Sequence, residues 1–215
     1  IIAAHPDDEI LGCGGTILKM KKNNQINAMF MTNGVSARSN NKMKINKRKK
    51  ACLNLFKYLK LQKPIFFNFP DNQMDKVPLL KIVNKIEKKI NTLKPDVIFT
   101  HFYGCLNIDH RLTYEATITA CRPIGKSNVN QILSFEIPSS TDWAYFKNKK
   151  FKPNFFIEIT KELNEKIKLL QFYKDELRKY PHSRSIKSIK SLASYRGSNC
   201  GKKYAEAFYL NRHIL

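Results

Sequence analysis

The stretch Ile1-Ile2-Ala3-Ala4-His5-Pro6-Asp7-Asp8-Glu9 decides how this chain folds. A short apolar run ends in a polar cluster, and the glycine-rich segment Gly12-Cys13-Gly14-Gly15 follows directly. This order predicts a buried parallel strand that leads through a βα loop into a helix. Loops at the carboxyl ends of such strands are where α/β sheets place their ligands.

The predicted loop carries one imidazole and two carboxylates. His5 stands where the strand ends, and Pro6 fixes the backbone φ of the turn. Because Asp7 and Asp8 are adjacent, their side chains cannot share one direction, so one can bind a metal while the other faces the space beside it. A catalytic zinc site usually has three protein ligands and an open position for water, so another strand end is expected to supply the third ligand.

A second apolar strand is predicted at Asp96-Val97-Ile98-Phe99-Thr100-His101. The tripeptide Asp109-His110-Arg111 then stands at the head of a helical run over residues 112–121. We therefore expect His110 at the same sheet edge as His5, where two imidazoles and one carboxylate suit Zn²⁺. Taken alone, an Asp-Asp pair before a helix is also typical of an N-cap whose charge complements the helix dipole.

Strands and helices alternate through the first two thirds of the chain. The patterns predict strands over residues 1–4, 27–32, 64–69, 97–101, 131–137 and 155–159. They predict helices over residues 9–22, 44–59, 79–93, 113–121, 161–179 and 183–195. The alternation indicates a single α/β domain over residues 1–215, with a mostly parallel sheet flanked by helices on both faces.

Several motifs together resemble the PIG-L (LmbE-like) family of zinc-dependent N-deacetylases. The main ones are His5-Pro6-Asp7-Asp8-Glu9 and Asn107-Ile108-Asp109-His110. The weaker ones are Thr32-Asn33-Gly34-Val35-Ser36 with Arg38, Phe69-Pro70-Asp71-Asn72, Arg196-Gly197-Ser198 and Tyr204-Ala205-Glu206-Ala207-Phe208. The segment Ser139-Ser140-Thr141-Asp142-Trp143 looks most like the bacterial branch, found among sugar-modifying enzymes.

The resemblance implies a Rossmann-like domain that removes acetyl groups from N-acetylglucosamine units on lipid, thiol-precursor or other carriers. It implies that His5, Asp8 and His110 hold Zn²⁺, with Asp7 as the general base. Many family members have a histidine three residues before the second metal histidine, where it helps stabilise the oxyanion. Asn107 occupies that place here, so either Asn107 donates a hydrogen bond instead, or His101 or a tyrosine does.

Other residues near the predicted site have two possible roles each. Asp109 could orient an imidazole, or could cap the helix that begins at Arg111. Arg38 could clamp a phosphate or sugar oxygen, or be a solvated surface side chain. Asp71 could accept hydrogen bonds from sugar hydroxyls, or serve only as a turn residue after Pro70.

Charge is the main argument for a different function. The formal net charge is +22, from 39 Lys and Arg against 17 Asp and Glu, which is typical of nucleic-acid binders. However, the basic residues are spread along the chain and are not gathered with aromatic residues. We expect the charge to favour a small, anionic amino-sugar substrate, such as a nucleotide sugar, and no specific nucleic acid.

The rival hypotheses are a basic nucleotide- or nucleic-acid-binding α/β module, and a metallohydrolase of the same fold that acts on a different acyl or amide bond. The glycine run lacks both the GxGxxG spacing and the Gly-Lys-Ser/Thr of a P-loop. The carboxylates before it would also repel phosphate.

The cysteines and the hydropathy of the chain indicate in which cell compartment the protein resides. The five cysteines are scattered without a CxxC pair, which is typical of reduced thiols in a cytoplasmic protein. We expect no transmembrane segment, because no run is long and apolar enough to cross a bilayer. The chain begins within a predicted strand and without Met, so we expect further N-terminal residues in the natural protein. Homo-oligomerisation is left open.

Overall fold

The computed structural model describes residues 1–37, 41–124 and 129–215. Its strands are β1 (Ile2–Ala3), β2 (Met29–Phe30), β3 (Ile65–Phe66), β4 (Val97–His101), β5 (Gln131–Phe135), β6 (Phe155–Glu158) and β7 (Ala205–His213). Its α-helices are α1 (Asp8–Met20), α2 (Lys42–Tyr58), α3 (Leu79–Leu93), α4 (Ile108–Ala120), α5 (Leu163–Leu169) and α6 (Ile186–Ser198). Two 3₁₀ helices, η1 (Met74–Lys76) and η2 (Leu170–Glu176), complete the regular structure.

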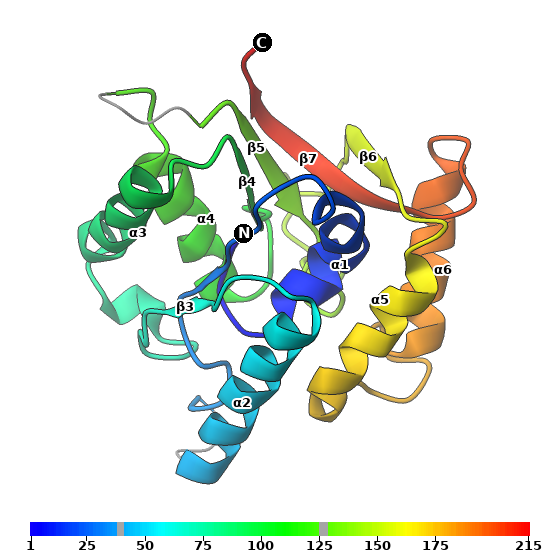
Figure 1. The fold of residues 1–215 in the computed structure, drawn as a ribbon, viewed down its shortest axis with the longest axis horizontal. Coiled ribbons are helices and arrows are strands. Elements are labelled where there is room, and N and C mark those ends of the chain that lie inside the picture. Colours follow the sequence, from blue (N-terminus) through cyan, green and yellow to red (C-terminus); the bar gives the residue numbers. More distant parts are fainter. Residues whose placement is uncertain (38–40, 125–128) are drawn as a thin grey trace.

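The strands form two groups that lie side by side (Figure 1). The first group has the order β1-β2-β3 and is parallel throughout, whereas the second has the order β4-β5-β7-β6 and is mixed. Within it β4 and β5 are parallel, and β7 is antiparallel to both β5 and β6. The groups meet where the N–H of Ala4, just after β1, donates to Nε2 of His101 at the end of β4, at 2.9 Å.

Helices cover both faces of this arrangement, because successive strand residues point to opposite sides. Ile2, Met29, Ile98 and Ile132 pack with the buried apolar residues of α3 and α4. Their sequence neighbours Ala3, Phe30, Phe99 and Leu133 pack with the apolar residues of α1 and α2. The predicted α/β class is thereby confirmed, but the sequence analysis did not predict β7 as a strand, and its antiparallel pairing makes the second group mixed.

Helix α1 is broken at Cys13, whose φ of −143° and ψ of 27° are not helical. The break leaves backbone groups in the second half of the helix without their usual partners. Glu206 on β7 accepts hydrogen bonds from the N–H groups of Gly15 at 2.8 Å and Thr16 at 2.7 Å. A carboxylate from the far end of the chain therefore caps the second half of α1.

Lys166 on α5 satisfies a backbone carbonyl group at the break in this helix. Its Nζ donates to the carbonyl oxygen of Leu11 at 2.9 Å and pairs with Glu206 Oε1 at 2.7 Å, with both charged side chains 5% exposed. The weak C-terminal motif around Glu206 thus has a structural explanation, since it fixes the helix that begins at the HPDDE loop.

The glycines of α1 serve close packing. A Cβ on Gly12 would lie 2.5 Å from Cδ2 of Phe135, and one on Gly15 would lie 2.6 Å from Cγ2 of Ile159. Since the N–H of Gly15 already binds Glu206, the glycine run has no geometry for cradling a phosphate. This weakens the nucleotide-binding alternative.

Two predicted helices differ most in extent from those of the structure, and α6 lies three residues further along the chain than the predicted range. The helix predicted over residues 161–179 is divided into α5 and η2, with Tyr173 in a non-helical conformation. Helix α4 begins at Ile108, five residues before the predicted start, because Asn107 is its N-cap. No helix within the described ranges is long and apolar enough to span a bilayer.

Substitution Glu206→Gln tests whether the Lys166–Glu206 pair stabilises the broken helix α1. The amide cannot accept both N–H hydrogen bonds, and Lys166 would lose its buried counter-charge, so we expect a loss of about 3–5 kcal/mol of unfolding free energy. Chemical denaturation measures it. The control is Glu165→Gln, which removes a partly exposed partner of Lys168 and should cost less than about 1 kcal/mol. Equal effects of the two substitutions would contradict this explanation.

Candidate active site

Three of the predicted metal ligands converge at the carboxyl edge of the strands. His5 Nδ1 lies 3.2 Å from Asp8 Oδ2 and 3.2 Å from His110 Nε2. His110 Nε2 is 3.4 Å from the same carboxylate oxygen, and all three side chains are buried. Two imidazole nitrogens and one carboxylate oxygen therefore face a common point.

The donor atoms fit a divalent cation. Asp8 Oδ1 is buried and has no hydrogen-bond partner among the described residues, which is unusual for a carboxylate oxygen. Burial and the nearby His101 lower the pKa of His110 to about 3, so its imidazole is neutral. Ser140 Oγ lies 3.3 Å from His110 Nδ1, which leaves Nε2 directed at the cluster. A neutral histidine oriented in this way is suited to ligate Zn²⁺.

A second group of possible ligands shares one residue with the first. His101, Cys105 and His110 also bring one ligand atom each within 4.8 Å of one another. However, burial raises the pKa of the Cys105 thiol to about 12, and its Sγ already lies 2.9 Å from Thr141 Oγ1. His101 Nε2 also accepts the N–H of Ala4, so this group is the poorer candidate.

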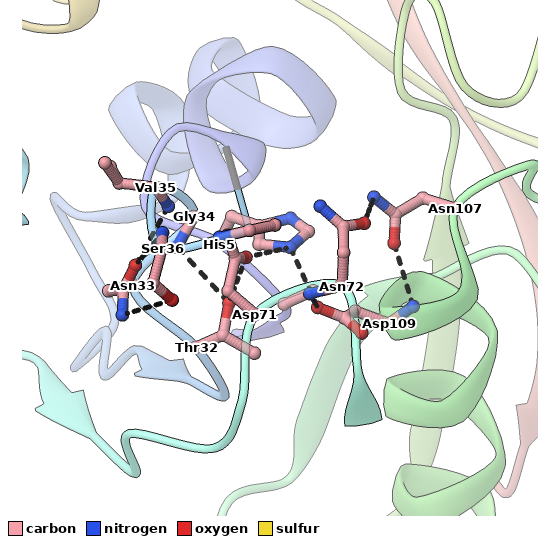
Figure 2. Close-up of polar contacts among 12 residues, drawn as sticks. His5, Thr32, Asn33, Gly34, Val35, Ser36, Asp71, Asn72, Asn107 and Asp109 are labelled. Atoms are coloured by element: carbon pink, nitrogen blue, oxygen red, sulfur yellow. Dashed lines mark hydrogen bonds and ion pairs between the residues drawn. The ribbon is translucent and has the colours of Figure 1, made fainter. Parts of the chain in front are cut away.

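The other ring nitrogen of His5 is held by two carboxylates, as Figure 2 shows. His5 Nε2 lies 3.2 Å from Asp109 Oδ2 and 3.3 Å from Asp71 Oδ1. Burial alone would lower the pKa of His5, but its hydrogen bonds with Asp109, Asp71 and Asp8 raise it well above the ordinary value. The two carboxylates orient the imidazole so that Nδ1 points to Asp8 and His110.

Asp109 does more than contact His5. It lies in the first turn of α4, where its oxygens accept hydrogen bonds from the N–H groups of Asn72 at 2.7 Å and Met74 at 3.2 Å. The interpretation of Asp109 as an N-cap is wrong, because the Oδ1 of Asn107 caps α4 by accepting the N–H of Asp109 at 2.8 Å. Asp109 orients an imidazole, but that imidazole belongs to His5 and not to the adjacent His110.

Asn107 is fixed at the cavity edge. Besides capping α4, it donates from Nδ2 to Oδ1 of Asn72 at 2.8 Å (Figure 2). The Nδ2 group carries a second hydrogen, which stays available for a ligand. His101 is fully buried and does not line the cavity; its ring stacks against His110 with centroids 3.9 Å apart. Of these two alternatives for the missing histidine, the geometry therefore favours Asn107.

Both carboxylate oxygens of Asp71 accept hydrogen bonds from within the protein. Its Oδ1 accepts a hydrogen bond from Thr32 Oγ1 at 3.0 Å, and its Oδ2 accepts from the N–H of Ala37 at 2.9 Å (Figure 2). Burial opposes a low pKa, but the hydrogen bonds with His5, Ala37 and Thr32 lower the pKa of Asp71 below its ordinary value. A role in binding sugar hydroxyls stays a prediction, and Arg38 lies outside the described residues.

Asp7 lies beside the cluster without joining it. Its φ of 132° is in the left-handed region, a strained conformation that functional sites can retain. Asp7 Oδ2 is 3.3 Å from Nη1 of Arg48 and 3.3 Å from Nη1 of Arg184, and Glu176 pairs with both arginines. Burial raises the pKa of Asp7, and the two guanidinium groups oppose this rise.

The two arginines that contact Asp7, and the glutamate that pairs with both arginines, were not predicted from the sequence. Arg48 lies in the middle of α2, Glu176 ends η2 and Arg184 lies in the loop before α6. Each is one charged residue among many in a basic chain, so no local motif distinguishes them.

Arg48, Glu176 and Arg184 line a cavity of about 360 Å³, which opens beside His5, Asp7 and His110. Its outer wall includes Trp143, which is 42% exposed, and His182, whose ring meets Trp143 edge to face with centroids 5.0 Å apart. The Trp143 ring therefore borders the cavity.

The fold and this cluster define an α/β protein with a candidate divalent-metal site at the carboxyl edge of its sheet. Residues 1–121 match the PIG-L family, described as GlcNAc-PI de-N-acetylase. The chain is also 32% identical over 157 residues to the uncharacterized deacetylase YaiS of Escherichia coli (strain K12), covering 70% of this chain and 78% of that protein. The chain belongs to the PIG-L family, as the sequence resemblance predicted.

Solved structures share the fold. The N,N'-diacetylchitobiose deacetylase of Pyrococcus horikoshii aligns with a TM-score of 0.78 and 20% identity over 98% of this chain and 82% of that one. GalB of Pseudomonas putida KT2440, a 4-carboxy-2-hydroxymuconate hydratase, aligns with a TM-score of 0.74 and 16% identity over 100% and 95%. At these identities the likeness concerns the fold, and the second case shows that the fold also carries a reaction other than deacetylation.

Metal content of three variants distinguishes the His5–Asp8–His110 group from the His101–Cys105–His110 group. We expect Asp8→Asn and His110→Ala to lose bound zinc after dialysis, because each removes a donor atom of the His5–Asp8–His110 group. Cys105→Ala should keep about one zinc per chain, since Cys105 is not a member of that group. Plasma emission spectrometry measures the metal and circular dichroism checks the fold. Loss of zinc from Cys105→Ala with retention in Asp8→Asn would assign the metal to the other group.

Proposed function

We propose that this protein is a zinc-dependent hydrolase that removes the acetyl group from an N-acetylated amino sugar or its conjugate. The observation that supports this most is the convergence of His5, Asp8 and His110 beside a spare carboxylate, Asp7, in one cavity. Membership of the PIG-L family and the deacetylases among its relatives support the same reaction class.

Amide hydrolysis needs an activated nucleophile, stabilisation of charge on the carbonyl oxygen, and a proton for the leaving nitrogen. A zinc ion held by His5, Asp8 and His110 would supply polarisation of the carbonyl and activation of water. The protein's own contribution begins with Asp71 and Asp109, which fix the ring of His5. Because Asp71 and Asp109 orient the imidazole of His5, they are expected to strengthen metal binding.

Asp7 is the proposed general base. Its carboxylate can take a proton from the attacking water and deliver it to the departing amine. Arg48 and Arg184 both contact Oδ2 of this carboxylate, so its position relative to Asp8 is fixed before the substrate arrives. Asn107 is the proposed hydrogen-bond donor to the carbonyl oxygen, through the second hydrogen of Nδ2.

The cavity wall suits a polar substrate of small size. Arginine side chains of the wall and the formal charge of the chain favour an anionic group on the carrier, such as a phosphate. Arg38 and Asp71 are the residues proposed to contact the sugar. We propose no specific nucleic-acid partner; weak, salt-sensitive adsorption to DNA is expected from charge alone.

A panel assay tests this function. Zinc-loaded protein should release acetate from N-acetylglucosamine conjugates, and should hydrolyse the corresponding O-acetyl esters more slowly. Release only from esters or from other amides would favour the alternative of a metallohydrolase that acts on a different bond. Tight nucleic-acid binding at physiological salt, without any acetate release, would favour the binding-module alternative.

Substitution Asp7→Asn tests the general base. The amide keeps the size of the side chain but cannot take a proton, so we expect a fall of about two to four orders of magnitude in kcat with zinc content unchanged. The matched control is Asp175→Asn, which changes an exposed carboxylate paired with Lys47 and should leave kcat within about twofold. Near-normal turnover of zinc-bound Asp7→Asn would exclude Asp7 from the reaction.

A further inference from the structure

The carboxylate of Asp7 is turned away from the helix that it precedes. Asp7 is the N-cap residue of α1, yet its side chain accepts no hydrogen bond from that helix. An N-cap aspartate usually has an extended backbone and accepts an N–H of the first helical turn. Asp7 instead has a φ of 132° and a ψ of −29°, and its Oδ2 faces Arg48 and Arg184 at the cavity. An interaction elsewhere must therefore keep Asp7 out of the capping conformation.

The peptide group that joins Pro6 to Asp7 is held on both of its polar atoms. Its carbonyl oxygen accepts a hydrogen bond from Nη1 of Arg48 at 2.5 Å, and its N–H donates to Oε2 of Glu9 at 2.9 Å. The carbonyl oxygen of Asp7 itself accepts two N–H groups of α1, at 3.1 and 2.9 Å. Because the planar peptide groups on both sides of the Asp7 Cα are held, its φ and ψ are fixed.

Tyr173 anchors the carboxylate that holds this peptide. Its hydroxyl donates to Oε1 of Glu9 at 2.7 Å, and its ring centroid lies 5.8 Å from the guanidinium carbon of Arg48. Glu9 is fully buried, Tyr173 is 3% exposed, and neither lines the cavity. Both oxygens of Glu9 therefore have partners inside the protein, and the side chain acts on Asp7 and not on a ligand.

The hydrogen bond from Asp7 to Glu9 is half of a familiar helix-capping arrangement. In a capping box, a glutamate of the first turn accepts the N–H of the N-cap residue, while the N-cap side chain accepts an N–H of the helix. In α1 only the glutamate half is formed. The carboxylate of Asp7 is thereby left to face the cavity, whereas an unrestrained aspartate at this position would favour the cap.

We propose that Glu9 and Tyr173 are positioning residues for Asp7. Glu9 holds the peptide before Asp7, Tyr173 holds Glu9, and the Asp7 carboxylate is kept at the cavity and away from the helix cap. The inference rests on the proposed function, in which Asp7 is the general base, and deepens it. It also gives a role to the last residue of the HPDDE motif, which the ligand spacing does not explain.

Two substitutions of similar length separate positioning from other roles of Glu9. Glu9→Met removes the acceptor for the N–H of Asp7. Glu9→Gln keeps it, because the amide oxygen accepts the N–H while the amide nitrogen donates to the phenol oxygen of Tyr173. We expect Glu9→Met to lower kcat about 10- to 100-fold, the effect of a misplaced group, with KM and zinc content near their wild-type values. Glu9→Gln should retain most of the turnover, with a loss below about threefold.

Tyr173→Phe removes only the hydroxyl that anchors Glu9. We expect kcat to fall about 3- to 10-fold, the range of one hydrogen bond, again without a change in KM or zinc content. The matched control is Tyr58→Phe, which removes a tyrosine–glutamate hydrogen bond of the same 2.7 Å length on the surface. It should leave kcat within about twofold. Circular dichroism checks that each variant is folded.

Crystal structures of zinc-loaded wild-type protein and Glu9→Met distinguish failure of this inference from failure of the proposed function. We expect Asp7 in Glu9→Met to adopt a negative φ, with its carboxylate capping α1. If no conjugate releases acetate but Asp7 moves in this way, the positioning role stands and the proposed reaction does not. If Asp7 keeps its φ of 132° and both arginine contacts, the inference is wrong whatever the assay gives.

Two further outcomes would overturn the positioning role. A loss in Glu9→Gln as large as that in Asp7→Asn would mean that Glu9 acts by transferring a proton, because the acceptor for the peptide N–H is retained. If Glu9→Met does not fold, Tyr173→Phe takes its place in both measurements. A kcat equal to that of Tyr58→Phe, with Asp7 unmoved in the crystal, would then contradict the inference.

Discussion

The site depends on the imidazole of His5 being held from both sides. One ring nitrogen faces Asp8 and His110, and the other faces Asp71 and Asp109. These contacts draw together the end of β1, the loop after β3 and the first turn of α4, which are far apart in the sequence. Because each carboxylate also accepts backbone hydrogen bonds, the ring cannot move without disturbing those loops.

Buried charged side chains also fix helix α1. The helix that carries Asp8 is broken at Cys13, and the buried Lys166–Glu206 pair replaces the hydrogen bonds that the break removes. Breaking a buried pair by removing one partner is costly, because an uncompensated charge is left behind. The C-terminal strand therefore contributes to the position of the His5–Asp8 loop at the other end of the chain.

Much of the fold could be predicted from the sequence, because apolar runs and helical spacing are local signals. Helix α3 and strand β4 have the predicted bounds, and both imidazoles of the ligand group come from the predicted sheet edge. The early start of α4 was missed, since capping by Asn107 depends on one side chain and leaves no periodic pattern.

The partners of Asp7 were beyond prediction for a different reason. Arg48 and Arg184 reach Asp7, and Glu176 reaches both arginines, only after α2, η2 and the loop before α6 have packed together. In a chain with 39 lysines and arginines, charge at a single position carries little information.

The central claim is that a single zinc held by His5, Asp8 and His110 is required for acetate release. The most direct measurement is the rate of acetate release from an N-acetylglucosamine conjugate, by protein stripped with a chelator and then titrated with zinc. The account predicts no activity in the stripped protein and a linear recovery that reaches its plateau near one equivalent of zinc. Full activity of the stripped protein, or no release at any zinc concentration from any conjugate, would contradict it.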